Sequence, residues 1–226
     1  MTNARYRITF GKGRQLRFTG HLDLHKSWER TFRRAKLTLA YSEGFSPRPK
    51  INIGAALPLG CTSEADLVDV ELVQEIETAH LIEALTAAAP PGLTISEITS
   101  VPNGSPKLQK LLQSSEYLIS VVCEDRERLE ARIETMLTSA ELPRARRGKE
   151  YDLRPLIEEM ELGDPQEVEL QTAGKGGRTG RPMELRLRLT ARSGATGRPD
   201  EVLRALELDP TPLVPHRVRL ILTPAI

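Results

Sequence analysis

The chain has 226 residues, of which 39% are hydrophobic and 28% are charged, a composition typical of a globular protein with one large or two small domains. It contains no apolar run of the roughly 20 residues that a membrane-spanning helix needs, and its N-terminal residues lack the apolar core of a signal peptide. With only two cysteines, Cys61 and Cys123, and no membrane segment, we expect a protein of the reducing cytoplasm.

The net charge of +1 conceals a segregation of charge along the chain. Residues 1–60 hold twelve Lys and Arg against three Asp and Glu, whereas residues 61–140 hold five against fourteen. A basic block of this kind indicates a face that binds a polyanion, provided that the acidic block lies elsewhere. If the acidic block, which includes Glu64, Asp66, Asp69 and Glu71, faces the basic one, the two neutralise each other. The sequence leaves both arrangements open.

The first half of the chain alternates between strand and helix patterns. Strands are predicted at 5–11, 51–57, 67–73 and 93–101, where apolar residues recur with the period of a half-buried strand. Helical patterns cover 21–36 and 78–89, and the second ends at Pro90-Pro91-Gly92. The order β-α-β-β-α-β predicts a ferredoxin-like unit over residues 1–101.

The same order recurs after a linker at 102–115. Strands are expected at 117–123, 168–172, 183–191 and 214–223, and helices at 125–139 and 199–206. Residues 144–162 form an insert after the first of these helices. The sequence therefore predicts an α+β protein of two tandem ferredoxin-like (βαββαβ) units with antiparallel sheets, at 1–101 and 116–226.

The helix at 21–36 carries the strongest functional signal. On a wheel of 100° per residue, a narrow apolar stripe is formed by Leu24, Trp28 and Phe32. The other side of the wheel carries Lys26, Arg30, Arg33 and Arg34. Like charges at these spacings repel each other, so an exposed cationic ridge indicates an anionic partner such as the phosphates of RNA. An ordinary solvated helix face explains the same pattern and stays open.

The segment that follows is a stiff loop, because Pro47 and Pro49 fix the backbone on both sides of Arg48. We expect Arg48 and Lys50 to face solvent. Tyr41 and Phe45 have rings of the kind that stack on unpaired bases, although we predict that Phe45 instead closes the top of the core.

Two further basic segments lie in the second half. Residues 144–149 (RARRGK) precede a segment in which Asp152 caps a short helix, and the glycine-rich residues 174–181 are interpreted as a hairpin tip. The residues predicted to bind nucleic acid or a partner are Lys12, Arg17, Lys26, Arg30, Arg33, Arg34, Tyr41, Arg48, Lys50, Arg146, Arg147, Lys149 and Arg154.

Motifs of catalysis and cofactor binding are missing. There is no Walker A sequence, no G-x-G-x-x-G between strand and helix, no C-x-x-C, no H-E-x-x-H and no G-x-S-x-G. We therefore expect no metal site and no cofactor. His21, at a helix start beside Lys12 and Arg17, is a weak catalytic candidate: as a general base it would permit metal-independent cleavage of RNA, helped by Lys12 or Tyr41. A helix-entry residue that is hydrogen-bonded to the loop is the plainer interpretation.

Several stretches carry a resemblance to a known family. They are residues 16–23 (LRFTGHLD), 33–35 (RRA), 40–50 (AYSEGFSPRPK), 57–60 (LPLG), and Lys149 with residues 151–155 (YDLRP). In these stretches the chain resembles the radical-SAM-linked family, an uncharacterised bacterial domain fused to, or encoded beside, a B12-binding-type radical SAM protein. The resemblance implies that a radical SAM protein is the partner and carries the cluster, and the family's frequent position near RNA-processing genes implies a role in RNA handling. Arg48 stands where histidine is more usual, which argues against acid–base chemistry there and leaves phosphate binding intact.

Three functional hypotheses follow. The first is a non-catalytic accessory protein of a radical SAM enzyme that binds structured or single-stranded RNA through the basic helix face and loop. The second is a docking module for that enzyme without RNA contact, and the third is a metal-independent ribonuclease that uses His21. Ferredoxin-like repeats also occur in RNA-binding proteins, but this analogy is one of fold alone.

Overall fold

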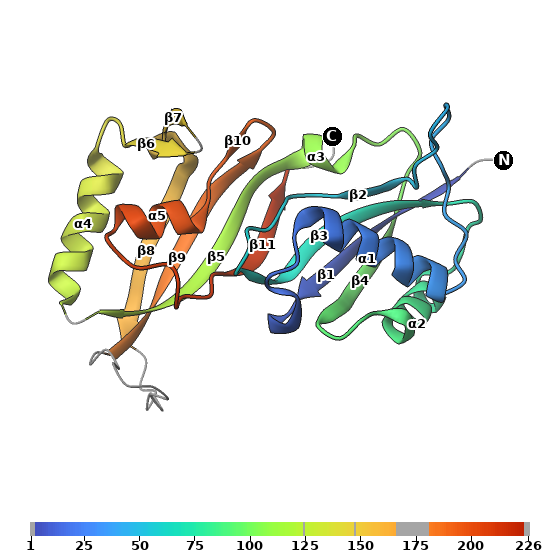
Figure 1. Cartoon of the computed structure of the whole chain (residues 1–226), viewed down its shortest axis with the longest axis horizontal. Helices are drawn as coiled ribbons and strands as arrows, with labels where there is room; N and C mark the ends of the chain where they lie inside the picture. Colours follow the sequence, from blue (N-terminus) through green and yellow to red (C-terminus); the bar gives the residue numbers. More distant parts are fainter. Residues whose placement is uncertain (1–2, 124, 147, 166–180, 224–226) are drawn as a thin grey trace. The chain divides into compact units, whose positions relative to one another are not determined.

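The computed structural model describes residues 3–123, 125–146, 148–165 and 181–223, which form a mixed α+β protein with mostly antiparallel strands (Figure 1). The chain divides into two compact units: residues 1–113 with 217–226, and residues 114–216. No helix in these described ranges is long and apolar enough to cross a membrane.

The first unit follows the strand and helix order expected from the sequence. Its elements are β1 (Ala4–Lys12), the 3-10 turn η1 (Arg14–Leu16), α1 (His21–Arg34), β2 (Ile51–Ile53), β3 (Thr62–Leu72), α2 (Thr78–Ala88), β4 (Leu93–Val101), α3 (Leu108–Leu111) and β11 (His216–Leu222). β1 pairs antiparallel with β3 on one side and β4 on the other, and β2 pairs antiparallel with β3. The strands therefore lie in the order β4-β1-β3-β2, with β11 also beside β3.

The core of this unit lies between the sheet and the two helices α1 and α2. Phe10 of β1 packs edge-on against Trp28 of α1 at 5.1 Å between ring centroids, and Phe32 lies one turn further along α1 at 5.5 Å from Trp28. Leu81 and Leu85 of α2 belong to the same buried cluster. Because burial of each large apolar side chain contributes about 1.5–3 kcal/mol, this cluster fixes which face of α1 points inward.

Two strands of this unit differ in length from those expected. The strand predicted at 51–57 ends at Ile53, and the strand predicted at 67–73 begins at Thr62. The start of β3 is polar in sequence but buried, because Ser63 accepts a hydrogen bond from the backbone N–H of Lys12 and Asp66 pairs with Arg217. Sequence patterns detect a strand from alternating apolar residues. Buried polar residues such as Ser63 and Asp66 do not produce this alternation, so the start of β3 was not predicted.

The second unit contains β5 (Leu112–Cys123, from Ser114 onward), α4 (Arg126–Thr138), β6 (Pro143–Arg146), β7 (Lys149–Asp152), the 3-10 turn η2 (Arg154–Leu156), β8 (Ile157–Pro165), β9 (Arg181–Arg192), β10 (Ala195–Thr196) and α5 (Pro199–Ala205). β9 pairs antiparallel with β5, β8 and β10, and β6 forms a separate hairpin with β7. The predicted helices at 125–139 and 199–206 and the strand at 183–191 are confirmed to within a few residues.

The segment expected as an insert, residues 144–162, holds most of the β6–β7 hairpin and much of β8. β8 lacks the alternating apolar pattern of a regular strand. Its pairing with β9 shifts register between Ile157 and Glu159, and as a result Ile157 and Met160 are both buried although they are three positions apart. A regular strand would place those two on opposite faces. The predicted strand at 168–172 and residues 174–180 of the glycine-rich segment 174–181 lie outside the described residues, and Arg181 is the first residue of β9.

The boundaries of the two units also differ from those expected. Residues 102–113 and the last strand belong with the first unit, where Leu108, Leu112 and Leu220 form a small buried cluster with Leu67. The backbone N–H of Thr223 donates to the carbonyl of Leu111 at 2.7 Å, which joins the end of the chain to α3.

Candidate nucleic-acid interface

Helix α1 turns its cations outward, as the wheel predicts. Leu24, Trp28 and Phe32 are buried. The residues of α1 that are exposed include Lys26, Arg30, Arg33 and Arg34. Arg33 and Arg34 lie in the last turn, where the partial negative charge of the helix C-terminus stabilises them.

A groove of about 690 Å³ lies along this cationic face; we call it the α1 groove. Its lining residues are Lys26, Glu29, Arg30, Arg33, Lys36, Leu37, Thr38, Leu39 and Tyr41. Four cations thus face a single acid, Glu29, whose carboxylate lies 3.0 Å from Nδ1 of His25. Lys26 is 3.9 Å from Asp23, and both side chains are well exposed, so this pair contributes little.

Residues 41–49 form a narrow hairpin that projects from the first unit (Figure 1). Tyr41 pairs with Pro49, the N–H of Ser42 donates to the carbonyl of Arg48 at 2.9 Å, and Gly44 adopts a positive φ of 125° near the tip. Phe45 is fully exposed. The prediction that Phe45 closes the core is wrong, because Phe10, Trp28 and Phe32 already fill it.

The hairpin also forms part of a second groove, of about 720 Å³, which we call the hairpin groove. Its lining residues are Asn3, Arg5, Ser42, Arg48, Pro49, Lys50, Ile51, Asn52, Asp69, Val70, Glu71, Asn103, Gly104, Ser105 and Lys107. Neither Arg48 nor Lys107 has a carboxylate partner among the residues that the structure describes. The side-chain oxygen of Asn52 is buried there without a hydrogen-bond donor in the described part of the chain.

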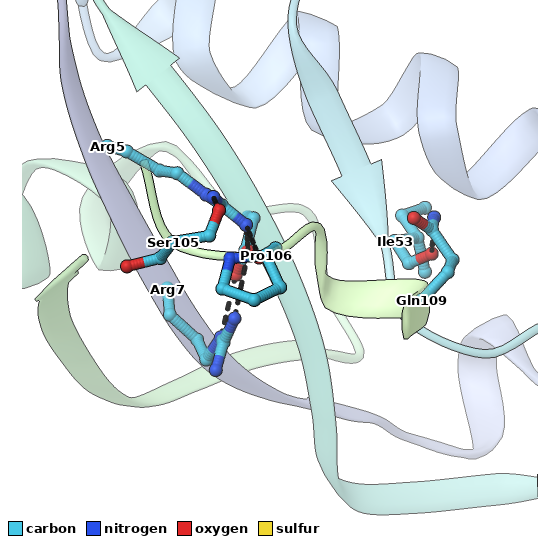
Figure 2. Close-up of polar contacts among 7 residues, drawn as sticks. Arg5, Arg7, Ile53, Ser105, Pro106 and Gln109 are labelled. Atoms are coloured by element: carbon cyan, nitrogen blue, oxygen red, sulfur yellow. Dashed lines mark hydrogen bonds and ion pairs between the residues drawn. The ribbon is translucent and has the colours of Figure 1, made fainter. Parts of the chain in front are cut away.

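Two members of the acidic block, Asp69 and Glu71, bind cations of β1 and the residue before β2, and not the cations of α1. Arg5 and Arg7 both bind Asp69, at 2.6 and 2.8 Å, and Lys50 binds Glu71 at 2.7 Å. Figure 2 shows how Arg5 also reaches across to Ser105 and Pro106, whose carbonyls accept at 2.8 and 2.9 Å and hold one wall of the hairpin groove in place.

Asp66, a further residue of the acidic block, is neutralised in a buried ion pair. Arg217 binds Asp66 at 2.6 Å, and each side chain is only 1% exposed. For Asp66, Asp69 and Glu71, the arrangement in which the acidic block masks the α1 cations is therefore not the one observed.

Lys12 and Arg17 lie differently from the other predicted residues. Lys12 is buried, and its ammonium donates to the carbonyls of Arg17 and Thr19 at 3.3 and 3.0 Å. Burial lowers the pKa of Lys12, while Asp66 partly opposes the shift. The guanidinium of Arg17 stacks on the ring of Phe18 at 4.5 Å. Lys12 therefore supports the loop before α1 and does not itself reach an RNA surface.

His21 begins α1 at the surface. Partial desolvation and then the neighbouring His25 lower its pKa, so His21 is uncharged at neutral pH. The ammonium of Lys12 is bound to backbone carbonyls and is not presented beside it. The described residues contain no group of three or more His, Cys, Asp or Glu side chains arranged to hold a metal ion.

The basic residues of the second unit have separate roles. Arg146 and Lys149 line a pocket of that unit, whereas Arg154 donates to the carbonyls of Leu137 and Ile157 and so holds the end of α4. Asp152 was expected to cap the short helix here, but the N-cap residue of η2 is Leu153, and Asp152 instead accepts from the N–H of Arg154 from one position earlier. Arg147 lies outside the described residues.

Sequence reasoning missed three cations that line the grooves: Arg5, Lys36 and Lys107. Lys36 lies one turn beyond Arg33 and is the last residue of the helix predicted at 21–36, so the helical wheel for that range already includes it. Lys107 comes from the loop before α3, and no local pattern places that loop beside the hairpin.

A family described as "Uncharacterized protein conserved in bacteria (DUF2344)" matches residues 5–196. No curated protein matches the chain. Among solved structures, "Crystal Structure of an Unknown Protein from Galdieria sulphuraria" is similar at 12% identity with a TM-score of 0.27, over 99% of this chain and 100% of that one, a score too low to support any argument.

Proposed function

This chain belongs to the family of uncharacterized proteins conserved in bacteria (DUF2344), and from this premise we propose that it is a non-catalytic RNA-binding protein. In this proposal, the first unit binds an unpaired stretch of RNA in the two grooves beside the hairpin 41–49. The observation that carries the proposal is the exposed aromatic side chain of Phe45 on a hairpin beside two grooves. Several cations that line these grooves have no carboxylate partner among the residues that the structure describes: Arg30, Arg33, Lys36, Arg48 and Lys107.

The chemistry of the hairpin supports single-stranded rather than duplex RNA. Side chains cannot read the deep, narrow major groove of an RNA helix, whereas unpaired bases stack on aromatic rings. Phe45 is fully exposed and Tyr41 is more than half exposed, so both rings are accessible to bases. Each such stack contributes about 1–3 kcal/mol and tolerates any base.

The cations of α1 supply the matching phosphate contacts. Lys26, Arg30 and Arg33 lie within one or two turns of each other and repel each other in the free protein. Phosphates bound in the α1 groove would relieve this repulsion and release counterions, which favours binding at low salt. The ridge thus gives binding without base specificity, and the hairpin adds a preference for unpaired over paired bases.

We also propose that the two units are ferredoxin-like. The connectivity β1-α1-β2-β3-α2-β4 with the strand order β4-β1-β3-β2 supports this for the first unit. In the second, β5 is followed by α4, then β8 and β9, and β9 lies between β5 and β8, which repeats the order of β1, β3 and β2. Ferredoxin-like sheets serve many functions, so this part of the proposal concerns the fold alone.

The partner in this proposal is a radical SAM enzyme, for which the chain acts as an accessory. Support comes from the resemblance in the segments 16–23, 40–50 and 151–155, two of which the structure places at the start of α1 and in the hairpin. The chain has no C-x-x-x-C-x-x-C sequence with which to hold the cluster itself. The enzyme would modify the RNA that the first unit binds.

The test is RNA binding over a salt series with the full chain and a charge-reversal variant, Arg30→Glu/Arg33→Glu. We expect the logarithm of the association constant to fall linearly with the logarithm of the salt concentration. The variant should bind at least about tenfold more weakly, with the slope reduced by about 1.4 for two lost phosphate contacts on a single strand. The matched control is Arg14→Glu/Arg128→Glu, which reverses two exposed cations outside both grooves.

Two results would defeat the RNA proposal. One is the absence of RNA binding by the unaltered chain at low salt. The other is a variant that binds with the affinity and slope of the control, since the α1 groove would then not be the site.

A specific surface favours a second candidate function, docking on the radical SAM enzyme. Phe18, Leu22 and Leu59 are exposed apolar side chains, and the N–H of Gly60 donates to the carbonyl of Arg17, which ties the loop of Leu59 to that of Phe18. If docking is the function, Phe18→Ser/Leu22→Ser should abolish co-purification with the enzyme while RNA binding stays unchanged. Loss of RNA binding in this variant would instead extend the RNA face to these residues.

A further inference from the structure

The second unit contains a pocket of about 550 Å³ that the proposed function does not use. Its lining residues are Arg146, Lys149, Tyr151, Asp152, Leu153, Leu156, Gly194, Ala195, Thr196 and Arg198. Two hairpins contribute to it, β6–β7 on one side and the turn between β9 and β10 on the other. Its volume is within the range of about 300–1,000 Å³ that small-molecule sites have.

The pairing of β6 with β7 explains why the cations and the aromatic ring share one face. Arg146 lies directly opposite Lys149, and the side chains of Lys149 and Tyr151, two residues apart, point to the same side of the strand. All three therefore project from one face of the hairpin, and all three line the pocket.

The charge of this pocket is not balanced from within. Neither Arg146 nor Lys149 forms an ion pair with any carboxylate that the structure describes. Arg198 is held by Asp200 through two contacts of 3.0 and 3.3 Å. The lining acid, Asp152, accepts from the backbone N–H groups of Leu142 and Arg154 through one carboxylate oxygen, Oδ1, and forms no ion pair with Arg146 or Lys149.

The rest of the pocket suits a flat, uncharged group. Leu153 is fully buried and lines the pocket together with Leu156. The hydroxyl of Tyr151 is hydrogen-bonded to the carboxylate of Glu201, which is itself nearly buried, and burial together with this carboxylate raises the pKa of Tyr151. The ring is thus fixed by its far end and stays a neutral phenol at neutral pH.

We propose that this pocket binds a nucleoside monophosphate group, with the phosphate on Arg146 and Lys149 and the base against the ring of Tyr151. Two cations without an acidic partner, beside an aromatic ring and two apolar side chains, are the complement of a phosphate joined to a planar base. The group is supplied either by a free nucleotide or by the phosphorylated end of an RNA chain, since both present the same chemistry.

The experiment is calorimetric titration of the full chain at low salt with AMP, GMP, CMP, UMP and inorganic phosphate. We expect at least one nucleotide to bind, and Arg146→Ala/Lys149→Ala to weaken it by roughly tenfold or more, since hydrogen bonds to a charged group are lost. Arg128→Ala, an exposed cation of α4 in the same unit, is the matched control and should bind as the unaltered chain does. Tyr151→Phe keeps the ring and should retain binding, whereas Tyr151→Leu should weaken it.

Three results would overturn the proposal: no binding of any nucleotide at millimolar concentration, binding undiminished in Arg146→Ala/Lys149→Ala, or inorganic phosphate that binds as tightly as the nucleotides. The two sources are separated by a trinucleotide with and without a 5′-phosphate. Tighter binding of the phosphorylated form than of the mononucleotide indicates an RNA end, and the reverse indicates a free nucleotide.

Failure of this site is distinguishable from failure of the RNA proposal. Arg30→Glu/Arg33→Glu leaves every residue of the pocket in place and should bind nucleotides as the unaltered chain does. Thermal unfolding of each variant shows whether a loss of binding reflects a loss of fold.

Discussion

Phe45 is completely exposed on the hairpin 41–49, and other residues of this hairpin line the two grooves, so the effects of Phe45 on stability and on binding should separate. Substitutions of exposed side chains change the free energy of unfolding by less than about 0.5 kcal/mol. Loss of one stacked base costs about 1–3 kcal/mol of binding. We therefore expect Phe45→Ala to unfold at the same denaturant concentration as the unaltered chain and to bind single-stranded RNA about 5- to 150-fold more weakly.

The comparison for this residue is Phe18→Ala, which removes an exposed ring outside both grooves. Equal RNA affinities for the two variants, measured by fluorescence anisotropy, would show that the hairpin tip does not stack on bases.

Lys12 predicts a pH dependence of stability. Because burial lowers its pKa below the ordinary 10.5, the unfolded chain binds more protons than the folded chain between these two values, and the free energy of unfolding rises with pH across that window. Lys12→Met removes this contribution, so its stability should rise less with pH. Urea unfolding from neutral pH up to 10.5 measures the difference. Parallel curves for the two proteins would contradict a lowered pKa of Lys12.

At the scale of elements, α1 is the clearest case in which binding and stability oppose each other. Arg30 is three or four residues from Lys26, Arg33 and Arg34, and each like-charged pair destabilises a helix by about 0.2–0.5 kcal/mol. Arg30→Gln should therefore raise the free energy of unfolding by about 0.5–1 kcal/mol, while RNA affinity falls.

Denaturant unfolding in low and high salt tests this expectation, since screening by salt should shrink the gain. Arg14→Gln, an exposed change in η1, should leave stability unchanged. A loss of stability in Arg30→Gln would mean that Arg30 has a structural role within the fold.

The elements also show what a sequence can and cannot predict. The buried stripe of α1 was predictable because a helix repeats its faces with a fixed period, so Leu24, Trp28 and Phe32 fall on one side whatever packs there. The partners of the acidic block were not, because strand register decides them: Arg7 binds Asp69 because β1 and β3 place the two opposite each other. The exposure of Phe45 follows from the pairing of Tyr41 with Pro49, which no local pattern indicates.

At the scale of the whole molecule, the first unit is assembled from both ends of the chain. Its buried ion pair joins Asp66 of β3 to Arg217 of β11, which also donates to the carbonyl of Ala55 at 3.0 Å. Removal of one partner leaves the other charge buried, which typically costs about 3–5 kcal/mol. We expect this loss for Arg217→Met, measured by denaturant unfolding.

The double variant Asp66→Asn/Arg217→Met also removes the unpaired buried charge of Asp66. It should therefore recover a large part of the unfolding free energy that Arg217→Met loses. Arg219→Met, an exposed change on the same strand, should cost less than about 1 kcal/mol. If the double variant is no more stable than Arg217→Met, the destabilisation arises from packing and not from charge.

The separation of these two charges along the chain sets a limit on how the protein can fold as it is made. Asp66 and Arg217 are 151 residues apart, and the whole second unit is translated between them. At roughly 5–20 residues per second, the ribosome needs about 8–30 s to cover that interval. During that time Asp66 lacks its partner Arg217, and β3 lacks its neighbouring strand β11. Domains usually fold in the order in which they are translated, with the N-terminal domain complete before the next one emerges. The first unit of this protein cannot follow that order, because its last strand is translated after the second unit, so the second unit can fold completely before the first.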